Sequence, residues 1–149
     1  MSHTPDKDAV VRSLKRFMDE HNWQDPNWCK VRNQVTRARK AWRQDQSNCE
    51  EPLDRAFNTA IGELERKLRP VYEENCARKK AIIQQLRERL DAGVSRVVLL
   101  RVAHDLQEEW KAIRPVPRRK DQRLWQDFRG LCDQVFTDRT SEPLTEDTT

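Results

Sequence analysis

The chain has 149 residues, a net charge of +4 and a charged fraction of 36%, with a mean hydropathy of -1.03. This length suits one domain with a modest core, yet only 31 residues are Leu, Ile, Val or Phe, close to the level of disordered chains. Five tryptophans supply large apolar surfaces, and there are only three glycines to interrupt helices. The composition therefore favours a folded helical chain and disfavours an all-β fold.

Membrane insertion and secretion are not expected from the sequence. The longest apolar run, Val97 to Leu100, is far shorter than the ~20 residues that cross a bilayer. The N-terminus lacks the apolar stretch of a signal peptide, so we expect a cytoplasmic protein with reduced thiols.

The cysteines do not have the spacing of a metal site. They are separated by 20, 27 and 56 residues, at Cys29, Cys49, Cys76 and Cys132. Zinc sites need closely spaced pairs, so we expect structural or surface thiols and no metal or other cofactor. Cys132 shares a helical face with Phe128 and Phe136, as a small buried hydrophobe would.

Two helix-start signals open the chain. Thr4-Pro5-Asp6 precedes apolar residues at helical spacing, with Thr4 as the expected cap, and predicts a helix to about Glu20. Asp25-Pro26 repeats this signal before a second helix, whose apolar stripe ends at Trp42.

The longest periodic segment follows a polar break at residues 44–50. Its apolar positions step by three and four and form a coiled-coil-like seam: Leu53, Phe57, Ile61, Leu64, Leu68 and Val71. Pro70 removes a backbone donor and predicts a kink or a helix end near Arg69. The pattern resumes to Leu90 and stops at Asp91-Ala92-Gly93.

Two more helices complete the pattern. Ser95 is a suitable cap for the first, which should end before Pro115 and Pro117. The second extends to about Arg139. Residues 140–149 are polar and acidic without periodicity, and we expect a disordered tail.

The chain aligns with itself as an internal repeat. At an offset of 68 positions, Val31, Ala38 and Trp42 correspond to Leu99, Leu106 and Trp110. At an offset of 71, Leu53, Phe57 and Leu64 correspond to Leu124, Phe128 and Val135. The expected repeat core is Trp42, Phe57, Trp110, Leu124 and Phe128. Each tryptophan should close a helical hairpin against the return helix, unless the alignment is a chance match of amphipathic helices.

These observations predict an all-α fold of elongated antiparallel helical hairpins, bundled or coiled-coil-like, with two repeat units joined by a long helix kinked at Pro70. The expected divisions are an N-terminal amphipathic helix at 1–24, a first repeat unit with the long helix at 25–92, a second repeat unit at 93–139 and the tail at 140–149.

One stretch of the second unit has a specific pattern. Trp110-Lys111 is followed by Pro115-Val116-Pro117, then by Leu124-Trp125-x-x-Phe128-Arg129 and by Cys132-Asp133-x-x-Phe136. This stretch resembles the bacterial family called domain of unknown function 349. A weaker likeness in the first unit extends the resemblance over roughly residues 28–139 and suggests two copies. The resemblance implies helical repeat modules of bacterial cytoplasmic proteins and no established reaction.

Positive charge is concentrated between the last two helices. Within ten residues, one acid, Asp121, accompanies five cations: Arg114, Arg118, Arg119, Lys120 and Arg123. Further cations, including Arg39 and Arg43, lie on helix faces, and Lys79 lies in a group expected to decorate the long helix. Such groups suit phosphate binding, although on helix faces the ordinary interpretation is that their stems cover apolar seams. Trp125 is expected either to stack on a base or, with Phe128, to pack internally.

Catalytic groups are sparse. His104 and Glu108 lie one turn apart, and a solvated helix face explains them as well as an acid–base pair does. We therefore expect a non-enzymatic module that binds structured RNA or a ribonucleoprotein, with no membrane or small-molecule partner. The alternative is a coiled-coil scaffold that binds other helical proteins through the 53–90 stripe.

Overall fold

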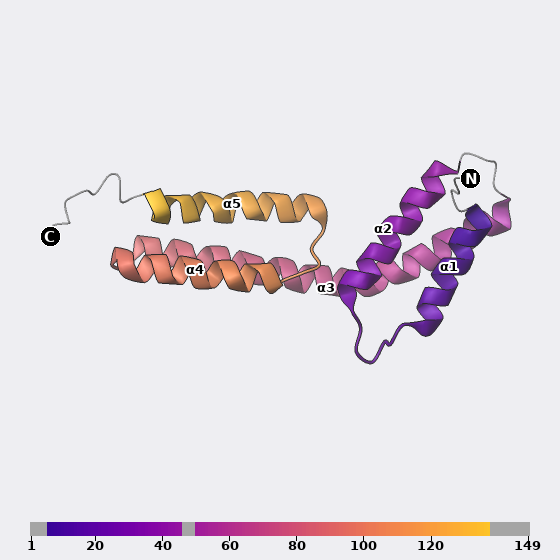
Figure 1. Ribbon diagram of the computed structural model, residues 1–149, viewed down its shortest axis with the longest axis horizontal. Helices are drawn as coiled ribbons and strands as arrows, with labels where there is room; N and C mark the ends of the chain where they lie inside the picture. The colour runs from indigo at the N-terminus through magenta and orange to yellow at the C-terminus, as the bar shows by residue number, and fades with distance from the viewer. Residues whose placement is uncertain (1–5, 46–49, 138–149) are drawn as a thin grey trace, which may run out of the picture. The chain divides into compact units, whose positions relative to one another are not determined.

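The computed structural model describes residues 6–45 and 50–137, and within these ranges it contains helices and no strand (Figure 1). The helices are α1 (Lys7–Glu20), α2 (Trp28–Gln44), α3 (Glu51–Asp91), α4 (Arg96–Ala112) and α5 (Arg118–Thr137). This confirms the predicted all-α fold. None of the described helices is long and apolar enough to span a membrane. The predicted tail at 140–149 lies outside the described residues, as do Thr4 and Cys49.

In α1 and α2 the cap is the residue after the proline. Asp6 accepts a hydrogen bond from the backbone N of Ala9 at 2.7 Å, and Asn27 accepts one from Lys30 at 3.1 Å. The cap is therefore Asp6 and not Thr4, because an Asx side chain immediately before the helix satisfies a free first-turn N–H. Ser95 caps α4 as predicted, accepting from the backbone N of Val98.

The long helix α3 continues through Pro70, so the helix end predicted near Arg69 is wrong. Leu68, before the proline, and Cys76, after it, are both buried. Packing on each side holds the backbone helical against the ~3 kcal/mol that a proline costs inside a helix. The kink at Pro70 stays a prediction. The helix ends at Asp91, and Gly93 takes a positive φ of 71°, as expected after a helix C-terminus.

The chain divides into two compact units inside α3, Met1–Val71 and Tyr72–Thr149. The sequence pattern predicts a boundary at 92/93, after the long helix. The packing boundary differs because the two halves of α3 contact different helices. Arg39 on α2 pairs with Glu65 in the first half, whereas Lys79 in the second half pairs with Asp121 on α5.

In the first unit, α1 and α2 form a hairpin that packs on the beginning of α3 (Figure 1). Its buried residues come from all three segments: Val10, Val11, Leu14, Val31, Val35, Ala38, Phe57, Ile61, Leu64 and Leu68. Trp42 stacks on Phe57 with ring centroids 3.9 Å apart and an interplanar angle of 12°. The Lys7 ammonium lies 5.1 Å from the Trp42 ring centroid. Trp42 of α2 thus packs against the return helix α3, as predicted.

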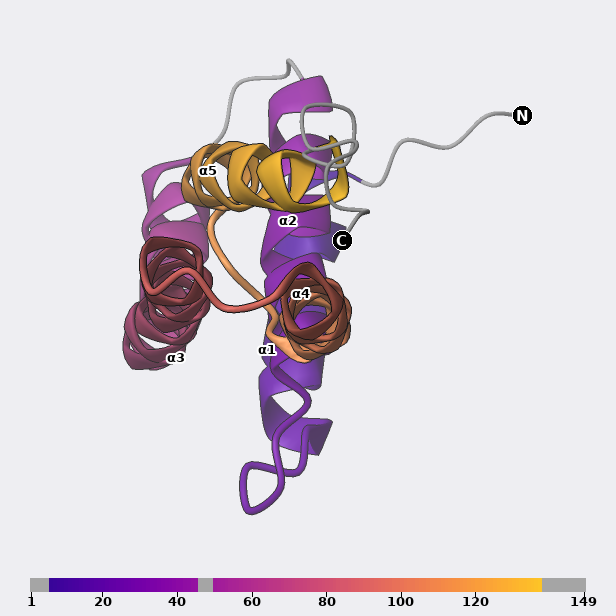
Figure 2. The same cartoon turned by 90° about the vertical axis from the view of Figure 1, so that its left-hand side faces the viewer.

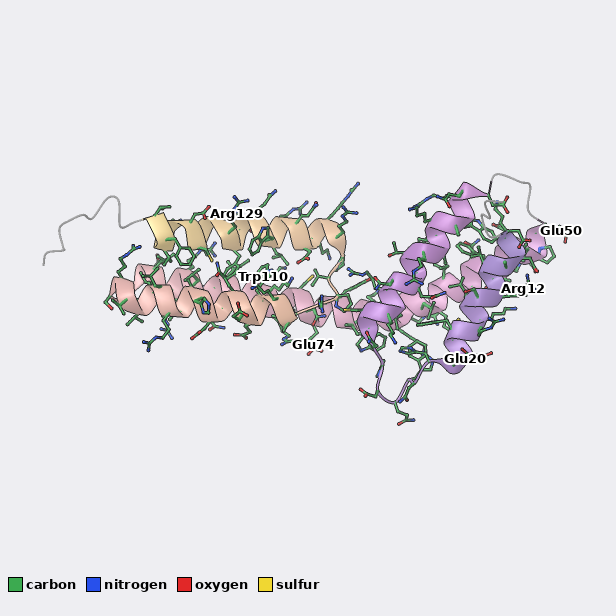
Figure 3. All side chains as sticks on the ribbon, viewed as in Figure 1. Arg12, Glu20, Glu50, Glu74, Trp110 and Arg129 are labelled. Atoms are coloured by element: carbon green, nitrogen blue, oxygen red, sulfur yellow. The ribbon has the colours of Figure 1, made fainter. Side chains whose placement is uncertain are left out.

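The second unit repeats this arrangement with the rest of α3, α4 and α5, and Figure 2 shows α4 nearly end-on. Its core includes Ile82, Ile83, Leu86, Ala103, Leu106, Phe128, Leu131, Cys132 and Val135. Trp110, labelled in Figure 3, stacks on Phe128 at 4.6 Å and 8°. Lys79 lies over the Trp110 ring at 4.7 Å.

The shared lysine–tryptophan–phenylalanine stack extends the internal repeat from two helices to three. At an offset of 72 positions, Lys7, Val10, Val11 and Leu14 of α1 correspond to Lys79, Ile82, Ile83 and Leu86 of α3. All six apolar residues of this set are buried. The first helix, predicted to lie outside the repeat, therefore belongs to it, because a hairpin needs a third helix to cover its apolar stripe.

Candidate nucleic-acid interface

The connection between α4 and α5 is held against α3 along its apolar side. Ile113 and Val116 are buried. The buried Asn75 of α3 donates a hydrogen bond from Nδ2 to the backbone O of Pro115 at 2.9 Å. Because the buried carbonyl and the buried amide satisfy each other, this contact gives the connection a fixed position on the unit.

Lys79 is a buried cation and not, as predicted, a surface one. It is 4% exposed, and its Nζ donates to Asp121 Oδ1 at 2.7 Å. The ammonium also lies over the face of Trp110, an arrangement that stabilises a desolvated cation. The burial of Lys79 and Asn75 was not predicted from the sequence because both side chains are polar. The usable signal was their position, since 75, 79, 82 and 86 follow the same three-four stripe.

The pairing of Asp121 with Lys79 leaves the neighbouring cations without a local acid. These cations are exposed and form no ion pair with any residue in 6–45 or 50–137. We call the five of them the basic loop: Arg114, Arg118, Arg119, Lys120 and Arg123. The structure thus brings together five of the seven predicted nucleic-acid-binding residues.

Three of these cations occupy the first turn of α5, where they are unfavourable in the absence of a ligand. Arg118, Arg119 and Lys120 lie at the positive end of the helix macrodipole. The free first-turn N–H groups of a helix lie at the same end. Like charges in this place raise the local positive potential, so an anion bound here relieves a repulsion that the fold itself creates.

The other two predicted binding residues lie in the first unit. Arg39 donates from Nη2 to Glu65 Oε2 at 2.6 Å, and both side chains are partly exposed. Arg43 is exposed in the last turn of α2, where a cation is favourable to the helix dipole. Both have an explanation within the first unit, so we assign the candidate interface to the basic loop alone.

Trp125 lies on α5, where two aromatic rings contact it. Its ring centroid is 6.0 Å from that of Trp110 and 6.1 Å from that of Phe128, in tilted and edge geometries. The predicted contact with Phe128 is present, yet the residue is 40% exposed. Trp125 is therefore partly packed and partly exposed to solvent.

In the part of the chain that the structure describes, no convergent catalytic arrangement surrounds His104. Its side chain is exposed on α4, with Nδ1 3.8 Å from Asp105 Oδ1, and Glu108 pairs with Lys111. Among the described residues, no three His, Cys, Asp or Glu side chains cluster as metal ligands would. Burial raises the pKa of the Cys132 thiol above its ordinary value, a hydrogen bond with Gln107 lowers it, and the charge of Asp133 raises it. This thiol is a core group.

The family comparison matches the middle of the chain. Residues 53–119 match the family described as Domain of Unknown Function (DUF349). The match covers α3, α4 and the connection to α5, a shorter range than the predicted 28–139, and two copies of the family stay a prediction. No curated protein and no solved structure matches the chain. Residues 53–119 are thus similar to the DUF349 family, the family that the sequence pattern predicted.

Proposed function

We propose that the protein is a non-enzymatic helical module that binds RNA through the basic loop. The observation that supports this function is the unequal use of charge between residues 114 and 123. The single acid, Asp121, is paired with a buried lysine, while five exposed cations form no ion pair with a described residue. Exposed Arg and Lys side chains in such density bind phosphates and release counterions.

RNA is favoured over a specific DNA sequence because we recognise no helix-turn-helix or other base-reading motif in the sequence. Recognition of RNA by shape and phosphate contacts needs no helix in a major groove. The cytoplasmic, bacterial setting that the family resemblance implies also fits an RNA or ribonucleoprotein partner.

The test is a salt series with a fluorescent RNA hairpin, which contains both paired and unpaired nucleotides. We expect the affinity of the wild type to fall steeply between 50 and 200 mM salt. Reversing Arg118, Arg119 and Lys120 to glutamate should abolish binding. If binding remains, the slope of log affinity against log salt should fall by the amount that roughly two to three phosphate contacts contribute.

The matched control reverses three exposed cations of α3 instead, Arg78, Lys80 and Arg87. It changes the net charge by the same amount, so a specific site predicts much weaker loss than in the loop variant. Equal loss in both variants, or binding that is insensitive to salt, would contradict the proposal.

The protein-interaction scaffold is the alternative function. It would use the apolar stripe of the 53–90 helix, but Phe57, Leu64 and Leu86 of that stripe are buried against the chain's own helices. This alternative predicts concentration-dependent self-association or partner binding that charge reversal in the loop leaves unchanged. Sedimentation of the wild type and the loop variant over a range of concentrations would measure it.

A further inference from the structure

The outer face of α5 continues the basic loop with an aromatic side chain. Arg118, Gln122, Trp125 and Arg129 follow one another by four, three and four positions, which places them on one face of the helix. At ~1.5 Å per residue, Trp125 lies about 10 Å along the axis from Arg118. All four residues are exposed, and Arg129 is labelled in Figure 3. We call this set the α5 stripe.

We propose that Trp125 stacks on an unpaired base of the RNA that the basic loop holds, so that the ligand is a single-stranded segment. This inference rests on the proposed function and adds to it the class of nucleotide that is bound. Single-stranded nucleic acids are bound by basic surfaces that follow the backbone and aromatic rings that stack on bases.

The packing of Trp125 suits a stacking platform. Trp110 and Phe128 contact it from the core side, at 6.0 and 6.1 Å between centroids, and restrict its orientation. Those contacts leave it 40% exposed. A ring that is already held in place loses little conformational freedom when a base stacks on it.

The first unit has the equivalent tryptophan–phenylalanine stack, but its described residues that align with the α5 stripe are neither aromatic nor cationic. At the offset of 71 positions that aligns Phe57 with Phe128, Trp125 corresponds to Asp54, Gln122 to Glu51 and Arg129 to Asn58. Asp54, Glu51 and Asn58 are exposed and bonded to each other or to Arg55 on α3. The stack of Trp42 on Phe57 thus forms without an outer tryptophan, so the fold does not require Trp125. The aromatic ring and the cations occur together in the second unit only, among the aligned positions that the structure describes.

A base inside a duplex is stacked on both sides and its face is not available to a protein side chain. Aromatic stacking therefore selects loops, bulges and single strands. The cations of the basic loop bind phosphates of either form. Trp125 and the loop should thus contribute differently to single-stranded and duplex ligands.

The experiment measures binding of the full chain to a labelled 12-nucleotide oligouridine and to a 16-base-pair RNA duplex at the same low salt. Trp125→Ala should weaken oligouridine binding about tenfold, the lower part of the range for one stacked base, and leave duplex binding within about twofold. Trp125→Phe retains a stacking ring and the contacts with Trp110 and Phe128, so it should recover most of the affinity. Val97→Ala on α4 removes another exposed apolar side chain and should change neither affinity.

Each outcome distinguishes the two proposals. Equal losses on both ligands, no loss with Trp125→Ala, or no recovery with Trp125→Phe would overturn the stacking role while the basic loop still binds. Failure of the wild type to bind either RNA would overturn the proposed function and the stacking role together. Circular dichroism and thermal unfolding of each variant confirm that the helices are intact.

Discussion

The two units contain the same stack of lysine, tryptophan and phenylalanine, but the lysine has different surroundings in each unit. In the first, the cation over Trp42 is Lys7, a half-buried residue in the first turn of α1. In the second, the cation over Trp110 is Lys79, which lies within α3, is buried, and also bonds Asp121. The common stack closes a helical unit, whereas the additional bond to Asp121 connects that stack to the basic loop. In the second unit, the lysine that lies over the tryptophan thus also fixes the position of an acid in the first turn of α5.

The largest difference should appear when each tryptophan is truncated. Trp110 is 6% exposed and contacts Phe128, Trp125 and Lys79. Trp110→Ala should therefore lower the free energy of unfolding by about 3–5 kcal/mol. Trp42 is half-buried, so Trp42→Ala should cost less, about 2–3 kcal/mol. Urea unfolding followed by circular dichroism measures both, and an equal cost would mean that the two stacks are equivalent.

The next prediction concerns the bond between Lys79 and Asp121 in the second unit. Asp121→Asn leaves the buried Lys79 without its carboxylate and should cost about 2–3 kcal/mol, because an uncompensated buried charge is strongly destabilising. Lys79→Met keeps the apolar stem and leaves only the partly exposed Asp121 unpaired, so it should cost less.

The double variant Lys79→Met/Asp121→Asn is the control for this pair. It should recover part of the loss seen with Asp121→Asn alone, since no charge is then buried. Additive costs from the two single variants would show that the pair is not coupled.

A smaller effect is expected at Cys132, which corresponds to Ile61 of the first unit at the offset of 71 positions. Burial raises the pKa of the Cys132 thiol, so the folded state holds this proton more tightly than the unfolded chain. Its contribution to stability is fully present below the ordinary thiol pKa and is lost as pH rises through the raised value. Cys132→Val should reduce the alkaline loss of stability, as measured by urea unfolding at a series of pH values. An unchanged pH dependence would contradict this assignment.

The smallest effect should come from the Arg39–Glu65 pair of the first unit. Both side chains are more than 40% exposed, and such pairs contribute about 0–1 kcal/mol. A double-mutant cycle with Arg39→Ala and Glu65→Ala measures the coupling. A coupling above about 2 kcal/mol would show that the first unit, like the second, depends on a specific ion pair.

Local sequence signals predicted most of the secondary structure correctly. Ser95 caps α4, the two prolines at 115 and 117 end it, and Gly93 follows α3. Errors arose where packing opposed a local signal. Pro70 disfavours a helix locally, yet burial of Leu68 and Cys76 on its two sides keeps α3 continuous. The candidate site was predicted in part, since the cluster of cations is local in sequence.

By itself, the sequence determined the helical class, the tryptophan–phenylalanine pairs and the concentration of charge near residues 114–123, because helical periodicity and net charge are local properties. Only the tertiary structure decided that Lys79 is buried, that Asp121 is paired with it and that Trp125 is left exposed. These facts depend on which side chains from α3, α4 and α5 meet. Residues 42 positions apart, such as Lys79 and Asp121, are brought together by folding and not by spacing.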